Sequence, residues 1–486
     1  MSTASPGAPI VPPSKPRRRR WPYLLAGVLL LLATPLAYYA LLQFRTQNDW
    51  RAAEAEADAL DPRWRMEQIL ADLAPIPDEE NLALATIRIL APGKTHVSMP
   101  VKRYEVLFPV DYPVNAEMNP EQIKFLGDNF QKLGKRLDDA RELRKYTKGR
   151  FKLAISEDFF STLMSDHQDV RILAEWLTHD ARLLAQDDEM DKALRSCESC
   201  LALGCTFRDD PFLIGFLIQC AMHSNAVIAI ERVLAQGEAT DAALLRVQQR
   251  TLAEYHATSW VTAMRGERAG QHQFFEGVRA GKLSLKGWTN GRGDGFFGAL
   301  TEGGGHLFPG IYLNQYPDLL RHNSALVEIS KLPTHKRKEK LDQSSKTVSD
   351  NRNRVIRVFS SAVTTIHSAE GRTRGLLLSA AVAIACERYR LQHPQRSWPG
   401  TLEDVVKKGM LDEVPRDPID NQALRFRTTK EGIVVYSIGP DGSDDGGKID
   451  RNNSNHPGVD VGMRLWTVNL RRQRALPAPA EREVPN

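Results

Sequence analysis

One long uncharged segment near the N-terminus constrains this 486-residue chain more than any other feature. The segment from Trp21 to Phe44 reads WPYLLAGVLLLLATPLAYYALLQF and contains 24 residues without a charge. A helix rises about 1.5 Å per residue, and the hydrocarbon core of a bilayer is about 30 Å thick. The segment therefore predicts one transmembrane helix over residues 21–44.

The charges that precede this segment predict its orientation. Arg17 to Arg20 come immediately before it, and basic residues beside a span favour the cytoplasmic side. We therefore expect a single pass through the inner (plasma) membrane, with the N-terminus in the cytoplasm and the bulk of the chain outside it. A cleaved signal peptide is the alternative, but the apolar run is long for one, and Pro35 occupies position −3 for cleavage after Ala37.

The net charge of +5 belongs to the N-terminal arm. Residues 1–20 hold Lys15 and Arg17 to Arg20 and no acid, so residues 45–486 carry 5 − 5 = 0. A neutral body argues against nucleic acid as a partner, because phosphate binding requires a concentrated basic surface. We expect residues 1–20 to form a disordered cytoplasmic tail and residues 471–486 a second disordered tail.

The region between the span and residue 350 predicts a mostly helical extracytoplasmic body. Asn119-Pro120 is a helix start signal, because an N-cap residue is followed by proline at the first helical position. Further helices are expected over residues 169–185 and 190–203, from Asp210-Pro211, over residues 225–235, and after a cap at Asp241. The short loops indicate an antiparallel array, so residues 119–270 are helical-repeat-like and offer a surface for a protein partner.

Glycine is concentrated at residues 281–310. This stretch lacks the G-x-x-x-x-G-K-[ST] order and a preceding apolar strand, so it predicts a surface loop or extended crossover rather than a phosphate-binding loop. His306 lies within it and is the histidine of most interest for catalysis. His-Glu-x-x-His, Gly-x-Ser-x-Gly and Ser-x-x-Lys patterns are not found in a context that supports catalysis, so we do not expect an enzyme.

The five cysteines are interpreted as structural. Cys197, Cys200 and Cys205 cluster at the predicted helix over residues 190–203 and the residues just after it, and neither a second cysteine pair for zinc nor a βαβ setting for redox chemistry accompanies them. Small buried apolar residues are the favoured interpretation, with a Cys197–Cys200 disulfide as the alternative. Cys220 and Cys386 are expected in helix cores.

Residues 351–470 differ in character from the array. Two helices are expected over residues 354–367 and 372–391, with a break at Gly371. A turn-rich stretch (VPRDPIDNQALRF) follows, then a strand over residues 432–439, an Asp- and Gly-rich loop, and a second strand over residues 461–470. A helix packed on a small antiparallel sheet is an α+β unit, so the chain as a whole is predicted to be mainly α with a small C-terminal α+β domain.

The ordered residues of this unit resemble the C-terminal domain of the major pseudopilin of type II secretion systems (protein G). The matching positions are Tyr389, Trp398, Pro399, Pro415, Asp417, Pro418, Asn421, Tyr436, Ser437, Gly439, Asp441, Gly442, Gly446 and Gly447. The resemblance covers residues 371–466, about a fifth of the chain. It implies a structural calcium ion in the loop after Tyr-Ser-x-Gly, with Asp441 and Asp460 matching the ligand aspartates of the family and Asp450 as the alternative to Asp460.

The composition of the loop supports calcium independently. Asp441, Asp444, Asp445, Asp450 and Asp460 place five carboxylates within twenty residues. Calcium takes six to eight oxygen ligands, in mixed shells of carboxylates and carbonyls. A solvated acidic turn is the alternative, because aspartate and glycine are common in loops.

Departures from the pseudopilin pattern limit what the resemblance implies. Pseudopilins begin with a short leader and a processing site, whereas here Arg-Arg-Arg-Arg-Trp-Pro precedes the span, and more than three hundred residues separate the span from residue 371. We expect a membrane-anchored extracytoplasmic interaction or structural protein. The alternatives are an accessory component of a type II secretion or pilus-like system, with pilin-like proteins as partners, and a membrane-tethered hydrolase with an unrecognised active site.

Overall fold

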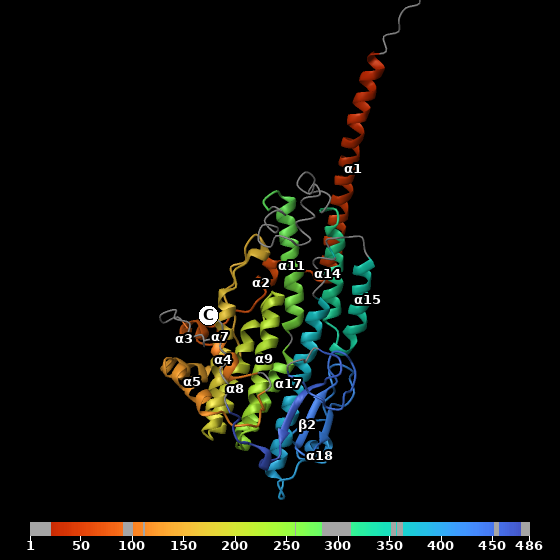
Figure 1. The fold of residues 1–486 in the computed structure, drawn as a ribbon. Helices are drawn as coiled ribbons and strands as arrows, with labels where there is room; N and C mark the ends of the chain where they lie inside the picture. Colours follow the sequence, from red (N-terminus) through yellow and green to blue (C-terminus); the bar gives the residue numbers. More distant parts are fainter. Residues whose placement is uncertain are drawn as a thin grey trace, which may run out of the picture.

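The computed structural model describes residues 21–90, 101–109, 112–257, 259–283, 313–350, 356, 363–451 and 456–477. It is mostly helical, with a small antiparallel sheet near the C-terminus, so the general fold class predicted from the sequence is confirmed (Figure 1). Residues 1–20, most of the glycine-rich stretch 281–310 with His306, and residues 478–486 lie outside the described residues.

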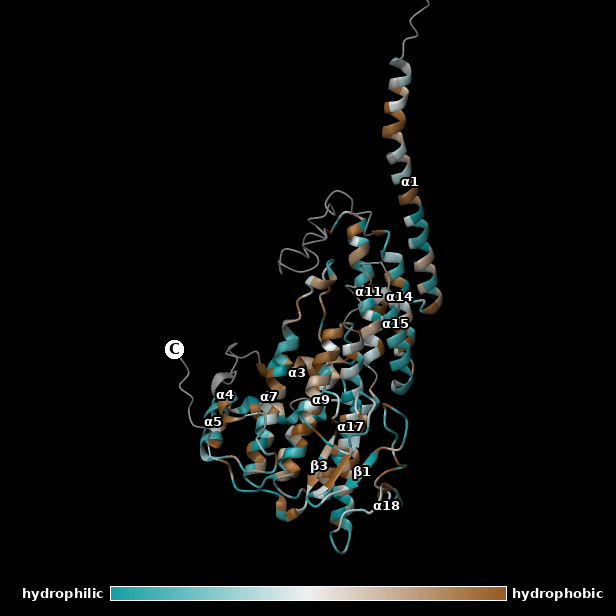
Figure 2. Cartoon of the chain, turned by 45° about the vertical axis from the view of Figure 1, so that its right-hand side comes forward, coloured by the Kyte–Doolittle hydropathy of each residue, from teal (hydrophilic) through white to brown (hydrophobic). Residues whose placement is uncertain are grey.

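Helix α1 (Trp21–Leu60) is a single 40-residue helix that projects from the body (Figure 1). Its outer half is apolar and exposed, and hydrophobic residues recur along the projecting part (Figure 2). Its inner half is buried through Trp50, Ala53 and Ala57, which pack in one cluster with residues of α14 (Tyr316–Ser330). By length and composition, α1 and α9 (Leu213–Leu234) are both apolar enough to span a membrane, but α9 is largely buried in the body.

The body consists of helices packed side by side, with α7, α8 and α9 in mutual contact and α10 and α17 beside them. The remaining bounds are α2 (Met66–Ala71), α3 (Leu82–Leu90), α4 (Val101–Leu107), α5 (Pro120–Gln131), α6 (Lys135–Arg141), α7 (Ser165–Gln186), α8 (Met190–Leu203), α10 (Asp241–His256), α11 (Ser259–Arg279), α15 (Arg337–Asp350), α17 (Val363–Gln392) and α18 (Leu402–Lys407).

Several helix boundaries agree with their local signals. Asn119 caps α5 by accepting a hydrogen bond from the backbone of Gln122, and α8 spans the residues predicted for it. The predicted cap of α10 is wrong by one position, because Thr240 is the N-cap and Asp241 is the first helical residue. Asp191 holds Thr240 in place through hydrogen bonds to its backbone N–H (2.9 Å) and hydroxyl (2.6 Å).

Two predicted helix breaks are absent. The helices expected from Asp210-Pro211 and over residues 225–235 form one helix, α9, because the Ser224 hydroxyl donates to the Cys220 carbonyl (2.9 Å) within the helix and does not interrupt it. Helix α17 also continues through Gly371, where a side chain would meet Ile419. In both places burial against neighbouring elements outweighs a local signal for a break.

The sheet has the order β1 (Arg425–Thr428), β2 (Gly432–Ser437), β3 (Val461–Trp466), and both pairings are antiparallel. Strands β2 and β3 confirm the two predicted strands, and Val435 lies opposite Met463. Strand β1 was not expected, since it falls at the end of the turn-rich stretch. It forms because Arg425 to Thr428 find backbone partners in β2 as the edge of the sheet.

Helix α17 joins this sheet to the helical array. It contacts β2 and β3 on one side and α9 and α10 on the other, and its residues 380–386 are fully buried. One hydrophobic core therefore contains Val227 of α9, Leu244 of α10, Ile384 of α17 and Val435 of β2. The first residues of the predicted C-terminal tail are also attached, because Arg471 pairs with the buried Glu387 of α17 at 2.9 Å.

All five cysteines are buried with free thiols, which confirms their interpretation as core residues. Cys197 and Cys200 do not form the alternative disulfide in this structure. Burial raises the pKa of the Cys197 thiol well above its usual value, so the thiol stays protonated.

Candidate functional site

The loop between β2 and β3, residues 438–460, carries the aspartates singled out from the sequence. It begins at a turn fixed by Asp417, which is 1% exposed. The Asp417 carboxylate accepts hydrogen bonds from the Ser437 hydroxyl (2.7 Å) and the Ile438 backbone N–H (3.0 Å), and pairs with Arg425 at 2.8 Å. Asp417 therefore fastens the turn before β1 to the start of the loop, a role that its place in the pseudopilin-like motif did not reveal.

Two of the five aspartates stabilise turns of the loop itself. Asp441 accepts hydrogen bonds from the backbone N–H groups of Ser443 and Gly458, each at 3.1 Å. Asp444 accepts from the Tyr436 hydroxyl at 3.1 Å and from the Gly446 N–H at 2.9 Å. Their carboxylates thus act as local acceptors for the backbone, as aspartates in turns commonly do.

Asp460 and Asp445 occupy the inner side of the loop. Asp460 is buried and accepts from the backbone N–H groups of Asp445 (3.3 Å) and Gly447 (2.7 Å). Gly447 has a φ of +81°, and a side chain there would meet Val434 at 3.0 Å, so only glycine fits. One oxygen of Asp445, Oδ2, is buried without a hydrogen-bond partner among the described residues.

Negative charge accumulates at this point. Burial raises the pKa of Asp460, and the neighbouring charges of Asp444 and Asp445 add to the effect, against the hydrogen bonds from Gly447 and Asp445. Burial and the hydrogen bond to Asp444 raise the pKa of Tyr436 to about 12. Burial is the largest cause of both shifts, and the neighbouring carboxylates raise each pKa further, so a cation beside them would favour the charged form of Asp460.

The five aspartates nevertheless do not converge on one point. Within the described part of the loop, no three acid side chains place one oxygen each within 4.8 Å of one another. Asp445 and Asp460 are brought together, Asp444 lies near them, and Asp441 faces the turn at Gly458. Asp450 lies at a separate cavity that it shares with Asp460.

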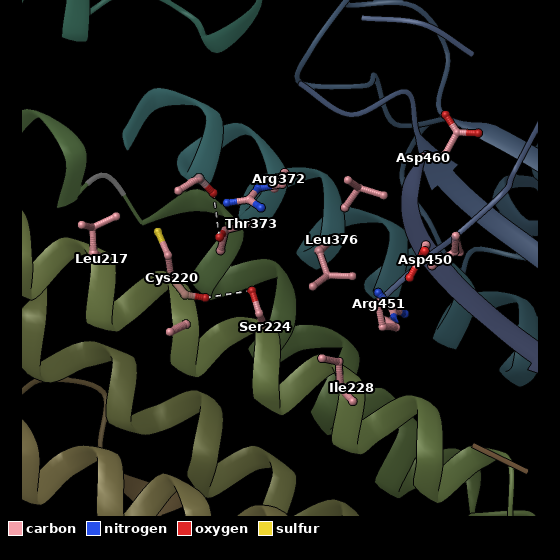
Figure 3. Close-up of a pocket in the computed structure, with 14 residues that line it drawn as sticks. Leu217, Cys220, Ser224, Ile228, Arg372, Thr373, Leu376, Asp450, Arg451 and Asp460 are labelled. Atoms are coloured by element: carbon pink, nitrogen blue, oxygen red, sulfur yellow. Dashed lines mark hydrogen bonds between the residues drawn. The ribbon is translucent and has the colours of Figure 1, made fainter. Parts of the chain in front are cut away.

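This cavity, of about 270 Å³, lies between α9, α17 and the end of the acidic loop (Figure 3). Its α9 wall includes Cys220 and Ser224, and Asp450, Arg451 and Asp460 lie on the sheet side (Figure 3). Other lining residues are Leu217, Ala221, Ile228, Ala369, Arg372, Thr373, Leu376, Ile449 and Val461. The wall is therefore mostly apolar over the helices and charged toward the loop.

Cys220 is the one thiol that lines this cavity. Burial raises the pKa of the Cys220 thiol to about 12, so it is protonated at neutral pH and a poor nucleophile. Arg451 is engaged by Glu231 of α9 at 2.7 Å and by the Gly462 carbonyl at 2.8 Å. These features suit a structural contact between sheet and array better than nucleophilic chemistry.

A second group of ligand-type side chains was not found from the sequence. The group consists of Glu54 on α1 and of His272 and Glu276 on α11. Among the described residues, this is the group of three whose ligand atoms all lie within 4.8 Å of one another. His272 and Glu276 are four residues apart on one helix, which is the only signal that the sequence offered. Glu54 lies too far away in the chain for a spacing argument to include it.

Comparison of the chain with protein-family models, with curated proteins and with solved structures finds no match.

Proposed function

We propose that this chain is a membrane-anchored extracytoplasmic scaffold whose C-terminal module is stabilised by calcium. The observation that carries the proposal is α1, whose outer half is apolar and uncovered while its inner half is buried in the body. An apolar helix of this length that none of the described elements covers suits a lipid environment. Arg17 to Arg20 support a cytoplasmic N-terminus.

A continuous helix gives such an anchor a defined mechanical role. Since α1 enters the body without interruption at Trp50, the span and the body are held as one unit rather than joined by a flexible linker. The end of the helix is further fixed by Asp61, which directly follows Leu60 and pairs with Arg265 at 2.7 Å and Arg268 at 2.6 Å. The body would therefore be presented at a fixed distance from the membrane.

The helical array supplies the proposed interaction surface. A groove of about 510 Å³ runs between α7 and α9, with Arg171, Glu175 and Arg182 among its lining residues. Its mixed charges and apolar floor suit a segment of another protein. We propose this groove as the protein-binding surface of the scaffold.

Fractionation of cells that produce the full chain tests the anchor. We expect the wild-type protein to resist extraction from membranes by alkaline carbonate. Replacing Leu30 and Leu31 with arginine should release it, because each charge at the centre of a span costs about 2.5–3.5 kcal/mol. Leu60→Arg is the matched control on the exposed inner end of α1 and should leave the protein in the membrane fraction. Soluble wild-type protein, or an N-terminus that begins after Ala37, would contradict the proposal.

The calcium proposal concerns the acidic loop. The unpartnered oxygen of Asp445 and the raised pKa of Asp460 support these two residues as ligands, and the carboxylate of Asp444 lies close enough to contribute charge. Calcium there would supply a structural cross-link between the loop and the start of β3. Asp441 and Asp450 are proposed only as outer contributors, because Asp441 caps a turn and Asp450 lines the cavity.

Thermal unfolding of the full chain in detergent tests calcium. The melting temperature should rise with calcium, not with magnesium, and return to its starting value with a chelator. Asp445→Asn should abolish the rise, and Asp412→Asn, an exposed aspartate outside the loop, should preserve it. Identical melting of the wild type in all three conditions would remove calcium from the proposal and leave the anchor untouched.

A secretion or pilus-related role is the second candidate. The order of one long helix followed by a three-stranded antiparallel sheet, α17 to β3, favours it because the pseudopilin-like motif residues occur in that unit. Such a protein would act as an accessory component that binds pilin-like proteins. Co-purification with such proteins from the native membrane, lost when the exposed edge strand β1 is altered, is the expected result, and its absence would favour the scaffold alone.

A further inference from the structure

At the membrane-proximal end of the body, a buried histidine is enclosed by aromatic side chains. His272 of α11 is 3% exposed, and its ring lies 4.6 Å from the Trp64 ring and 6.4 Å from the Trp50 ring. Its Nδ1 lies 2.7 Å from the hydroxyl of Tyr316 on α14. This contact fixes the ring orientation, and with Nδ1 as the donor it leaves the Nε2 lone pair on the opposite side.

The Nε2 atom faces two carboxylates and has no hydrogen-bond partner among the described residues. It lies 3.8 Å from Oε1 of Glu54 and 3.6 Å from Oε2 of Glu276. Both distances exceed the 2.7–3.2 Å of an N–H···O hydrogen bond. A buried polar atom that is oriented but unpaired carries a free-energy penalty, which a ligand between these atoms would remove.

The spacing matches that of ligands around a small metal ion. All three ligand atoms lie within 4.8 Å of one another. With bonds of about 2.0–2.2 Å to nitrogen and oxygen, tetrahedral ligands lie about 3.4 Å apart, so a small inward movement suffices. The set of one imidazole and two carboxylates suits zinc, whereas calcium prefers six to eight oxygens.

The neighbouring charges leave these atoms available. Oε1 of Glu276 pairs with Arg279 at 3.2 Å, which leaves Oε2 toward His272. Arg65 forms an ion pair with Asp58, and Arg268 forms one with Asp61, each at 2.6 Å. Oε1 of Glu54 accepts from the Trp50 indole N–H at 2.7 Å and retains a second lone pair. Burial, followed by the charges of Arg65 and Arg279, lowers the pKa of His272 to about 3, so the imidazole is neutral at physiological pH, as a ligand must be.

We propose that Glu54, His272 and Glu276 bind one zinc ion, which joins the anchor helix α1 to α11. Three protein ligands leave the fourth position for water. The ion joins the base of the projecting helix to the body, with one coordination position open to water. The proposal depends on the contacts of α1 inside the body and not on calcium binding or on a protein partner.

Titration of the full chain in detergent with cobalt(II), after removal of metals with a chelator, tests this site. Cobalt(II) in a tetrahedral nitrogen and oxygen site gives visible absorption bands, which zinc chloride should abolish by displacement at one equivalent. Glu54→Gln and Glu276→Gln should each weaken zinc binding at least about tenfold. Glu276 is 44% exposed on its side chain, so its replacement by the isosteric amide should leave the fold intact, as circular dichroism can verify.

The matched control is Glu56→Gln. Glu56 lies on the same helix as Glu54, is exposed, and pairs with Arg321 at 2.9 Å. Zinc affinity should be unchanged in this variant. The absence of saturable binding to the wild type, or binding that is equal in the wild type, Glu54→Gln and Glu276→Gln, overturns the proposal.

Discussion

The two acidic regions of the molecule differ in how their carboxylates are used. In the C-terminal loop, Asp441 and Asp444 accept hydrogen bonds from backbone N–H groups two residues away, and Asp460 accepts from the Gly447 N–H of the same loop. At the base of α1, Glu54 and Glu276 come from different helices and face the Nε2 atom of His272, which has no hydrogen-bond partner among the described residues. The first region is dense in acid in the sequence, and the second is assembled only by the fold.

The difference shows that a high content of acidic residues in a segment does not by itself create the geometry of a metal site. A turn rich in Asp and Gly uses its carboxylates to satisfy its own backbone, so few oxygens remain oriented toward a common point. At the helix site, Glu54 and Glu276 have local side-chain partners in Trp50 and Arg279 but also face His272. The comparison therefore predicts strong zinc dependence at the helix site, and a calcium effect in the loop that depends mainly on Asp445.

The largest loss of stability is expected from replacing a buried carboxylate that accepts several hydrogen bonds. Asp417→Ala would leave the Ser437 hydroxyl and the Ile438 N–H without their acceptor, and would leave Arg425 paired with Asp420 alone of these two aspartates. Each buried donor left without an acceptor costs about 1–3 kcal/mol, so we expect a loss of about 3–5 kcal/mol in the free energy of unfolding, measured by urea unfolding of the full chain in detergent. The exposed control Asp412→Ala should change it by less than about 0.5 kcal/mol. Equal effects of the two substitutions would refute the role given to Asp417.

Glu254 of α10 provides a reference for a buried acid that arginines neutralise. Burial would raise its pKa, but His223 (3.4 Å), Arg250 (3.1 Å) and Arg208 (2.9 Å) outweigh burial and lower it to about 2. Because the folded pKa lies below the unfolded value of about 4.5, the stabilisation is present above pH 4.5 and is lost as the pH falls toward 2.

The size of this pH effect is about 3 kcal/mol, at about 1.4 kcal/mol per pH unit. Unfolding free energies of the wild type and Glu254→Gln, measured between pH 2 and 6, check it. The wild type should lose more stability over this interval than the variant does. Parallel curves for the two proteins would show that Glu254 is not held in its charged form.

Zinc should raise stability by a comparable amount. A ligand at 100 times its dissociation constant adds about 2.7 kcal/mol, so the melting temperature should rise by several degrees. The rise should be lost in Glu276→Gln and kept in Asp460→Asn. If Asp460→Asn abolished the zinc response instead, the roles assigned to the two acidic regions would be reversed.

The smallest loss of stability is expected from removing the hydrogen bond to Asp444, on the exposed side of the loop. Tyr436→Phe removes the hydroxyl that donates to Asp444 at 3.1 Å. We expect a loss of about 1 kcal/mol, as for a single hydrogen bond, with the calcium response unchanged. A complete loss of that response would show that Asp444 must be oriented by Tyr436 to bind the ion.

Elements with strong local signals were predictable from the sequence. Asn119-Pro120 begins α5, and the period of apolar residues outlines α8, because capping and amphipathicity depend only on nearby residues. The continuity of α9 and α17 was missed, because a Ser-Asn pair and a glycine suggest breaks that tertiary packing overrides. Strand β1 was missed for a related reason, since an edge strand follows from its partner.

The candidate sites were predictable to different degrees. The aspartates of the loop are visible as composition, but their hydrogen-bond partners are set by turn conformations that composition does not specify. Asp417 was noticed as a motif residue, while its partners Ser437 and Ile438 lie on another segment. Glu54 and His272 meet only because α1 packs near α11, which no spacing in the sequence reveals.

The most direct test of the contrast between the two regions is X-ray diffraction from crystals of the protein grown with zinc and calcium, with data collected on both sides of the zinc absorption edge. We expect an anomalous peak for zinc between Glu54, His272 and Glu276, and none in the loop between β2 and β3. A zinc peak among the aspartates of that loop, or an empty site at His272 in crystals saturated with zinc, would contradict it.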